Sequence, residues 1–114
     1  MTSVVIGGSV KGIDEEAFAE CINLASVVIG NGVTYINSSA FAYCNALTSV
    51  VIGDGVTNIG NHLFAYCMNL VSIEFAGTVA QWNAITKGAY WNSNLSVTEV
   101  VCSDGMVQIT KIAA

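Results

Sequence analysis

Apolar residues recur along the chain with a fixed 23-residue period. The tetrapeptide Val-Val-Ile-Gly begins at Val4, Val27 and Val50. The same shift aligns five further apolar slots: Val10, Val33 and Val56; Ile13, Ile36 and Ile59; Phe18, Phe41 and Phe64; Cys21, Cys44 and Cys67; and Leu24, Leu47 and Leu70. The polar slots between them vary freely. This contrast is typical of a solenoid, in which equivalent inward side chains of successive coils stack in ladders.

Each repeat contains the elements of one coil. Residues 26–29 are short and β-branched, which predicts a strand with Val28 outward and its neighbours inward. Residues 31–32 supply a turn, residues 33–36 a second short strand, and residues 38–44 a single helical turn with a serine cap. The predicted fold is therefore a right-handed, leucine-rich-repeat-like solenoid of short β-strands and single helical turns.

The pattern changes near residue 77. We expect residues 1–76 to form about three coils plus a partial one, and residues 77–114 to form a capping segment of the same single domain. Thr78 to Gln81 reads as a capping box that begins a short helix. Residues 97–102 and 106–112 flank the turn Ser-Asp-Gly and predict a β-hairpin. Three large side chains are expected to cover the apolar end of the last coil: Trp82, Tyr90 and Trp91.

The composition excludes several classes of protein. With 114 residues, 54% of them hydrophobic, 10% charged and no proline, the chain suits one packed domain. Its net charge is −5 and it lacks arginine, so no basic patch for nucleic acid is expected. Apolar runs such as residues 46–53 are interrupted well before the ~20 residues of a bilayer-spanning helix, so membrane insertion is not expected.

The chemically reactive side chains do not form a recognisable active site. Three of the four cysteines share one slot next to the inward leucine, which predicts a reduced, buried ladder; a Cys44–Cys67 disulfide is sterically conceivable but not indicated. The sequence contains no Cys-x-x-Cys, the spacing typical of structural zinc sites. His62, the single histidine, occupies an outward slot and reads as a solvated residue. We expect no metal, no cofactor and no enzymatic activity.

The remaining candidate is a partner-binding surface. On the first strand of each coil the outward slot holds Val5, Val28 and Val51, and then Glu74, flanked by Ser26, Ser49 and Ser72. Two interpretations stay open: stacked outward valines mark an interaction site, or valine simply suits a parallel sheet. A second row, Tyr43 and Tyr66, is either a contact stripe or packs under the next coil.

Residues 44–52 (Cys-Asn-Ala-Leu-Thr-Ser-Val-Val-Ile), with Ala40 and Phe41 ahead of them, resemble the BspA-type leucine-rich repeat of bacterial surface proteins. The resemblance covers residues 4–75. Residues 77–78, 81–85 and 101–105 also resemble the closing segment of family members from gut bacteria. The resemblance implies an extracellular or cell-surface protein that adheres to host or matrix proteins or to other cells, in a family without common catalytic residues.

Two functional hypotheses follow. The first is a non-catalytic protein-interaction or adhesion module whose partner is a protein or a host or matrix ligand. The second is a structural spacer or C-terminal cap of a longer repeat protein. The opening residues show no secretory signal, so we expect a segment of a longer chain. The uncapped coil at residues 4–7 predicts a homodimer through this exposed end.

Overall fold

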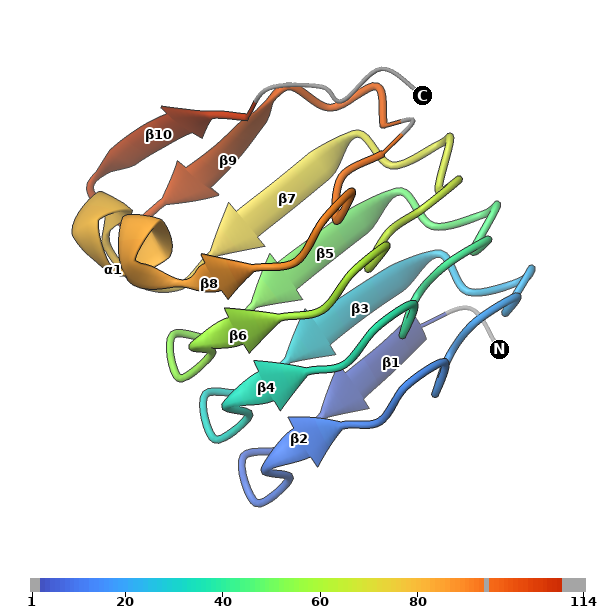
Figure 1. The fold of residues 1–114 in the computed structure, drawn as a ribbon, viewed down its shortest axis with the longest axis horizontal. Helices are drawn as coiled ribbons and strands as arrows, with labels where there is room; N and C mark the ends of the chain where they lie inside the picture. The colour runs from blue at the N-terminus through green and yellow to red at the C-terminus, as the bar shows by residue number, and fades with distance from the viewer. Residues whose placement is uncertain (1–2, 94, 110–114) are drawn as a thin grey trace.

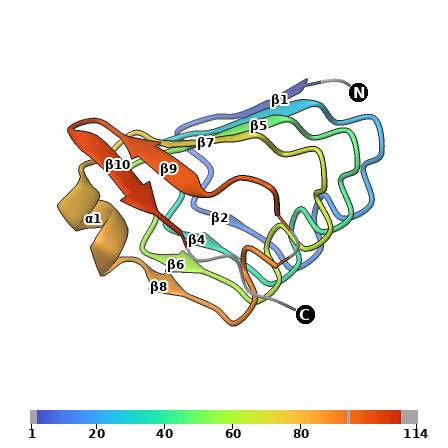
Figure 2. The same ribbon diagram turned by 90° about the horizontal axis from the view of Figure 1, so that it is seen from above.

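The computed structural model describes residues 3–93 and 95–109 as a β-solenoid (Figure 1). The end of the second predicted hairpin strand, residues 110–112, lies outside the described residues. Seen along another axis, two sheets face each other with the core between them (Figure 2). The larger sheet contains, in spatial order, β1 (Ser3–Ile6), β3 (Ser26–Ile29), β5 (Ser49–Ile52), β7 (Ser72–Phe75), β9 (Glu99–Cys102) and β10 (Gly105–Gln108). The smaller contains β2 (Gly12–Ile13), β4 (Tyr35–Ile36), β6 (Asn58–Ile59) and β8 (Thr86–Lys87).

The predicted ladders are confirmed. Strands β1, β3 and β5 pair in parallel, and each residue lies opposite its equivalent in the next repeat, as Val4 does opposite Val27. The phenylalanine rings stack in chain order, with centroids 5.2 Å apart between Phe18 and Phe41 and 5.9 Å apart between Phe41 and Phe64. Phe41 and Phe64 are fully buried. Each such ring contributes roughly 2–3 kcal/mol through burial, so the core depends on neighbouring coils covering each other.

Glycine follows the first strand in the first three coils, at Gly7, Gly30 and Gly53, whereas Ala76 holds this slot in the fourth. A Cβ added at Gly53 would lie 2.5 Å from the carbonyl oxygen of Gly30 and 2.6 Å from that of Ile29. Gly7 occupies the same slot in the first described coil, yet a Cβ there would meet nothing within 4 Å. The backbone of the preceding coil therefore crowds the slot at Gly53, while the slot at Gly7 is open.

The predicted helical turn at residues 38–44 is wrong. This segment forms turns whose amides alternate between two kinds of acceptor: the Ala42 amide donates within the segment to the Ser39 carbonyl at 3.1 Å, whereas the Tyr43 amide donates to the Ala65 carbonyl of the next coil at 2.8 Å. Ser39 and Tyr43 have φ angles of 58° and 61°. In an α-helix the Tyr43 amide would donate to the Ser39 carbonyl four residues back, so its bond to the adjacent coil replaces a helical one.

The predicted helix near the C-terminus is confirmed as α1 (Val79–Ala84). The Thr78 hydroxyl accepts a hydrogen bond from the Gln81 amide at 3.1 Å, and the Gln81 side chain accepts one from the Thr78 amide at 2.8 Å. The helix does not close the repeats. It interrupts the fourth coil, because β8 pairs with β6 and β9 pairs with β7. The segment after residue 76 thus both caps and continues the solenoid.

A lysine stands in the inward ladder of the fourth coil. Ile59 pairs with Lys87. The repeat period by itself would align Ile59 with Trp82, but α1 lengthens the chain between β7 and β8, so Lys87 takes this slot. The Lys87 ammonium donates to the carbonyls of Trp82 at 2.8 Å and Ile85 at 3.2 Å, and lies 4.8 Å from the Trp82 ring centroid. Burial lowers the pKa of Lys87. The ammonium thereby satisfies carbonyls at the C-terminal end of α1.

Two of the three predicted covering residues behave as expected. Trp82 and Trp91 are buried and contact each other edge to face, with centroids 5.6 Å apart. Tyr90 is exposed, so its predicted role in covering the core is wrong. Its backbone turns left-handed, with φ of 58°, and this directs the ring to the surface.

The cysteine ladder is reduced, as predicted, and it also links the coils. The Cys44 thiol donates to the Phe18 carbonyl at 3.1 Å and the Cys67 thiol donates to the Phe41 carbonyl at 2.9 Å. All four cysteines are free, and Cys44 and Cys67 are buried. The neighbouring Cys44 thiol and then burial raise the pKa of Cys67 above its ordinary value of 9.0.

Replacing Gly53→Ala should lower the free energy of unfolding by about 1–3 kcal/mol, because the added methyl group overlaps carbonyls of the preceding coil. The matched control is Gly7→Ala in the same slot, which should leave stability unchanged or raise it by up to about 1 kcal/mol. Urea unfolding followed by circular dichroism measures both. Equal losses in the two variants would contradict the role of coil spacing.

Alkylation with iodoacetamide should distinguish the half-buried thiol of Cys21 from the buried thiols of Cys44 and Cys67. We expect Cys21, which is half-buried, to react first in the folded protein, while Cys44 and Cys67 react only at the rate of unfolding, since both thiols are buried and donate to carbonyls. Peptide mass spectrometry over time, with a urea-unfolded control in which all four react, gives the rates. Rapid native-state labelling of Cys67 would disprove the buried ladder.

Candidate partner-binding surfaces

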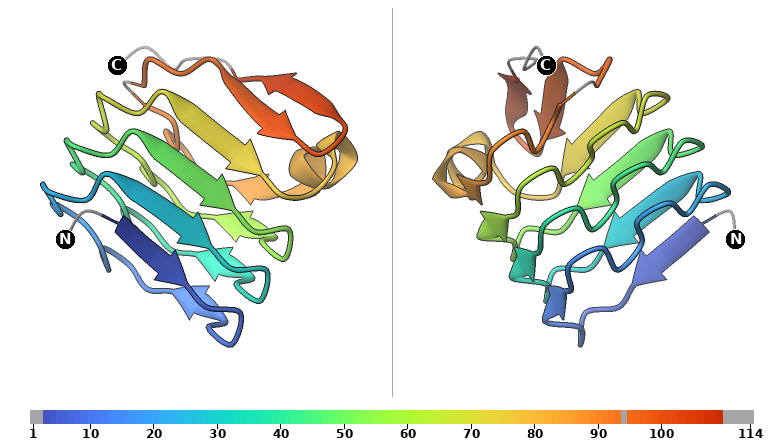
Figure 3. Two further views of the ribbon diagram at one scale, coloured as in Figure 1. Left: turned by 180° about the vertical axis from the view of Figure 1, so that it is seen from behind. Right: turned by 45° about the vertical axis from the view of Figure 1, so that its right-hand side comes forward.

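The outward row predicted on the larger sheet forms a continuous surface, here named the strand face. Val5, Val28, Val51 and Glu74 lie opposite one another on adjacent strands, and this sheet lies in front in the left view of Figure 3. Val5 is 76% exposed, Val28 is 40% exposed and Val51 is half-buried. The flanking serines Ser26, Ser49 and Ser72 are half-buried. The strand face therefore presents an apolar row beside a row of hydroxyl groups.

The strand face extends beyond the residues found from sequence. Val101 on β9 lies opposite Glu74 and is exposed. Met106 on β10 pairs with Val101 and is also exposed. Sequence reasoning missed both because the repeat period aligns Glu74 with Val97 instead of Val101. The alternation within residues 97–102 was the available signal for an outward Val101.

Charge on the strand face is negative. Glu74 is exposed on β7, and Glu99 lies at the start of β9, where its Oε2 accepts a hydrogen bond from the Gln108 side chain at 3.4 Å. Among the described residues the two lysines lie elsewhere: Lys87 in the smaller sheet and Lys11 just before β2. The strand face thus combines apolar side chains with carboxylates that have no described lysine beside them.

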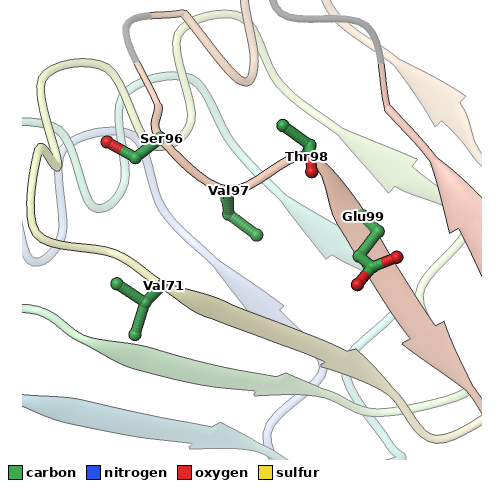
Figure 4. Close-up of a pocket in the computed structure, with 5 residues that line it drawn as sticks. All are labelled: Val71, Ser96, Val97, Thr98 and Glu99. Carbon is green, nitrogen blue, oxygen red and sulfur yellow. The ribbon is translucent and has the colours of Figure 1, made fainter.

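A shallow pocket lies where β7 and β9 begin. It is lined by Val71, Ser96, Val97, Thr98 and Glu99 and has a volume of about 220 Å³ (Figure 4). Ligand sites for small molecules usually measure about 300–1,000 Å³. This pocket is therefore large enough for one side chain of a partner but too small for a typical cofactor.

The tyrosine row predicted on the turn segments also lies at the surface. Tyr43 and Tyr66 stack with centroids 5.0 Å apart and an interplanar angle of 9°. They are 48% and 41% exposed, so they do not pack under the next coil. We name this side, formed by the turn segments of successive coils, the turn face.

A second aromatic pair on the turn face was not found from sequence. His62 stacks on Tyr90 with centroids 5.4 Å apart. His62 is exposed, as predicted, but it belongs to a stack rather than standing alone in solvent. Because α1 lengthens the fourth coil, the repeat period aligns His62 with Ile85 instead of Tyr90. The hydrogen bond from the His62 amide to the Ala89 carbonyl fixes the register of the stacked pair.

Left-handed backbone makes these exposed rings unusual. Tyr43, Tyr66 and Tyr90 have φ angles of 61°, 61° and 58°. For a bulky residue this conformation costs about 1–2 kcal/mol. Ring stacking stabilises such a pair by about 0.5–1.5 kcal/mol, which offsets part of that strain. The turn face consequently presents stacked aromatic side chains on left-handed backbone.

The candidate reactive side chains lie in different environments within residues 3–93 and 95–109. The described residues contain no group of three or more His, Cys, Asp and Glu side chains able to hold a metal ion. The imidazole of His62 is exposed, whereas the thiols of Cys44 and Cys67 are buried and donate to carbonyls. No helix in this part of the chain has the length and apolar character needed to cross a membrane.

Comparison with known proteins supports the resemblance drawn from the repeats. Residues 1–113 match the family model "BspA type Leucine rich repeat region (6 copies)". No curated protein matches the chain. Among solved structures, a leucine-rich cell surface protein from Faecalibacterium prausnitzii A2-165 is similar, with 24% sequence identity and a TM-score of 0.47. The match covers 75% of this chain but only 35% of that one.

The family match spans nearly the whole chain, and the chain folds into the repeated coils of a solenoid. The protein therefore belongs to the BspA-type leucine-rich-repeat family.

Proposed function

We propose that this protein is a non-catalytic interaction module of a bacterial surface protein, and that it binds a protein partner through the strand face. The observation that carries the proposal is the row of outward side chains on the larger sheet. Glu74 interrupts this row, and its apolar members are exposed except for the half-buried Val51: Val5, Val28, Val51, Val101 and Met106. Exposed apolar side chains gathered on one face often mark an interaction site. Membership of a family named for leucine-rich repeats supports a binding role and an extracellular or cell-surface location.

Charge indicates which partner the strand face would accept. Glu74 and Glu99 lie on it, and its described residues include no lysine. A second copy docking face to face would bring these carboxylates together, which disfavours self-association by this face. A host or matrix protein with apolar and basic side chains fits better. Such a complex should weaken as salt screens the charges.

The double variant Val28→Glu/Val51→Glu tests the strand face. It should reduce affinity for a purified matrix or mucin ligand more than about tenfold, because charged carboxylates would replace the valines that pack against apolar side chains of the partner. Like charges across the strands should lower the free energy of unfolding by no more than about 2 kcal/mol, so the protein stays folded. Biolayer interferometry against a panel of immobilised matrix proteins and mucins measures the affinities.

A matched control places the same two charges on the other sheet. Asn58→Glu/Thr86→Glu alters two exposed residues that face each other on β6 and β8. This variant should bind as the unchanged protein does. Equal binding by both double variants would exclude the strand face as the binding surface.

A second candidate function is a structural segment that associates through its first described coil. A cavity of about 420 Å³ lies at this end, with the exposed side chains of Val5 and Val10 among its lining residues. The edge of β1 there has no neighbouring strand within the described residues. Exposed apolar surface next to an open strand edge favours association with another copy. Asp14 also lines the cavity, so two such ends repel each other at low salt.

Light scattering coupled to size exclusion tests this candidate. The mass should rise from 11.9 kDa towards twice that value with protein concentration, and more so at high salt. Ala17→Glu, an exposed residue of the cavity, should keep the protein monomeric, while Ala89→Glu on the fourth coil should not. A mass that stays at one chain at the highest soluble concentration would rule out the dimer.

A further inference from the structure

A pocket on the turn face combines an aromatic ring with a carboxylate. It is lined by Glu20 and Ile22 of the first coil and by Tyr43 and Asn45 of the second, and its volume is about 260 Å³. All four residues are exposed. The Glu20 amide donates to the Ala42 carbonyl at 2.8 Å, which places the two turn segments side by side. The pocket is therefore a fixed feature of the coil stacking.

Tyr43 contributes a ring face that no other described ring covers. One face stacks on Tyr66 at 5.0 Å. On the other side, the equivalent slot of the first coil holds Glu20 instead of a third tyrosine. Glu20 and Tyr43 share the left-handed backbone of this slot, with φ angles of 60° and 61°. The aromatic column thus ends at a carboxylate, where Tyr43 and Glu20 line the same pocket.

The pocket carries the negative charge of Glu20. Asp14, Glu15 and Glu16 precede Glu20 in the same turn segment and are exposed, but none of them lines the pocket. Neither lysine of the described residues lines the pocket, and the whole chain carries −5. An aromatic face attracts a cation through its quadrupole, and a neighbouring carboxylate attracts it through direct charge. Both effects favour a cation in the pocket.

We propose that this pocket binds the side chain of a lysine on a partner polypeptide. The methylene groups of that lysine lie along Ile22 and the Tyr43 ring. Its ammonium donates hydrogen bonds to the Glu20 carboxylate and the Asn45 side-chain oxygen. A primary ammonium, with three donors, matches one carboxylate and one amide better than a quaternary ammonium, which donates none. This site lies outside the strand face and does not depend on it.

An NMR titration with Nα-acetyl-lysine N-methylamide tests the proposal directly. The lysine probe should shift the ring signals of Tyr43 and the methyl signals of Ile22, and the shifts should diminish as salt is added. The norleucine analogue, which has the same stem without the charge, should bind at least about fivefold more weakly, as expected for one charge pair near 4 Å in water. Equal shifts with norleucine would overturn the proposal.

Matched variants separate the carboxylate from the ring. Glu20→Gln should weaken the lysine probe about fivefold, while Glu16→Gln, in the same turn and also left-handed, should have little effect. Tyr43→Leu should weaken it about two- to fivefold and Tyr43→Phe should not, because the ring face rather than the hydroxyl makes the contact. Tyr90→Leu is the aromatic control, since it is exposed and left-handed but belongs to the other stack.

Three results would overturn the assignment. They are loss of binding in Glu16→Gln equal to that in Glu20→Gln, equal loss in Tyr43→Phe and Tyr43→Leu, and stronger shifts with methyl glycosides than with the lysine probe, which would indicate a saccharide site. Val28→Glu/Val51→Glu should bind the probe normally. Its normal binding would separate this site from the strand face, so failure of one proposal leaves the other testable.

Discussion

Every level of this structure depends on backbone hydrogen bonds between successive coils. Parallel pairing holds neighbouring strands about 4.8 Å apart, so equivalent residues of adjacent coils must fit directly against each other. The phenylalanine stack, the buried thiols and the glycines that follow β3 and β5 all meet this one requirement. The same requirement operates on the surface, where outward side chains form columns whether or not they contribute to the core.

Surface columns give the protein two faces of different chemistry. The strand face presents apolar residues and carboxylates on a flat sheet, while the turn face holds aromatic rings on left-handed backbone. The turn face arises because amides that a helix would use internally donate to the next coil instead. Strain at Tyr43 and Tyr66 and their stacking at 5.0 Å are thus two results of one hydrogen-bond pattern.

The C-terminal segment shows how the solenoid tolerates an insertion. Helix α1 lengthens the fourth coil between β7 and β8, yet β8 and β9 resume pairing with the preceding coil. Lys87 then occupies an inward slot, where its ammonium reaches helix carbonyls instead of apolar neighbours. Trp82 on the helix and Trp91 after it cover the core. The apolar end of the coils is therefore covered even though the parallel strand pairing continues.

The period alone determined the fold class, the core ladders and the row Val5, Val28, Val51 and Glu74, because identical apolar slots can be buried together only when coils stack in register. Helix α1 was also predictable, since its capping box is local. The tertiary structure decided the rest. Val101 and Tyr90 lie in surface columns, but the inserted helix α1 shifts both residues away from the 23-residue spacing. The turn segments are not helical, because some of their amides donate to carbonyls of another coil. Hydrogen-bond partners that are distant in sequence leave no local pattern, and this is the physical reason these features appeared only in the folded chain.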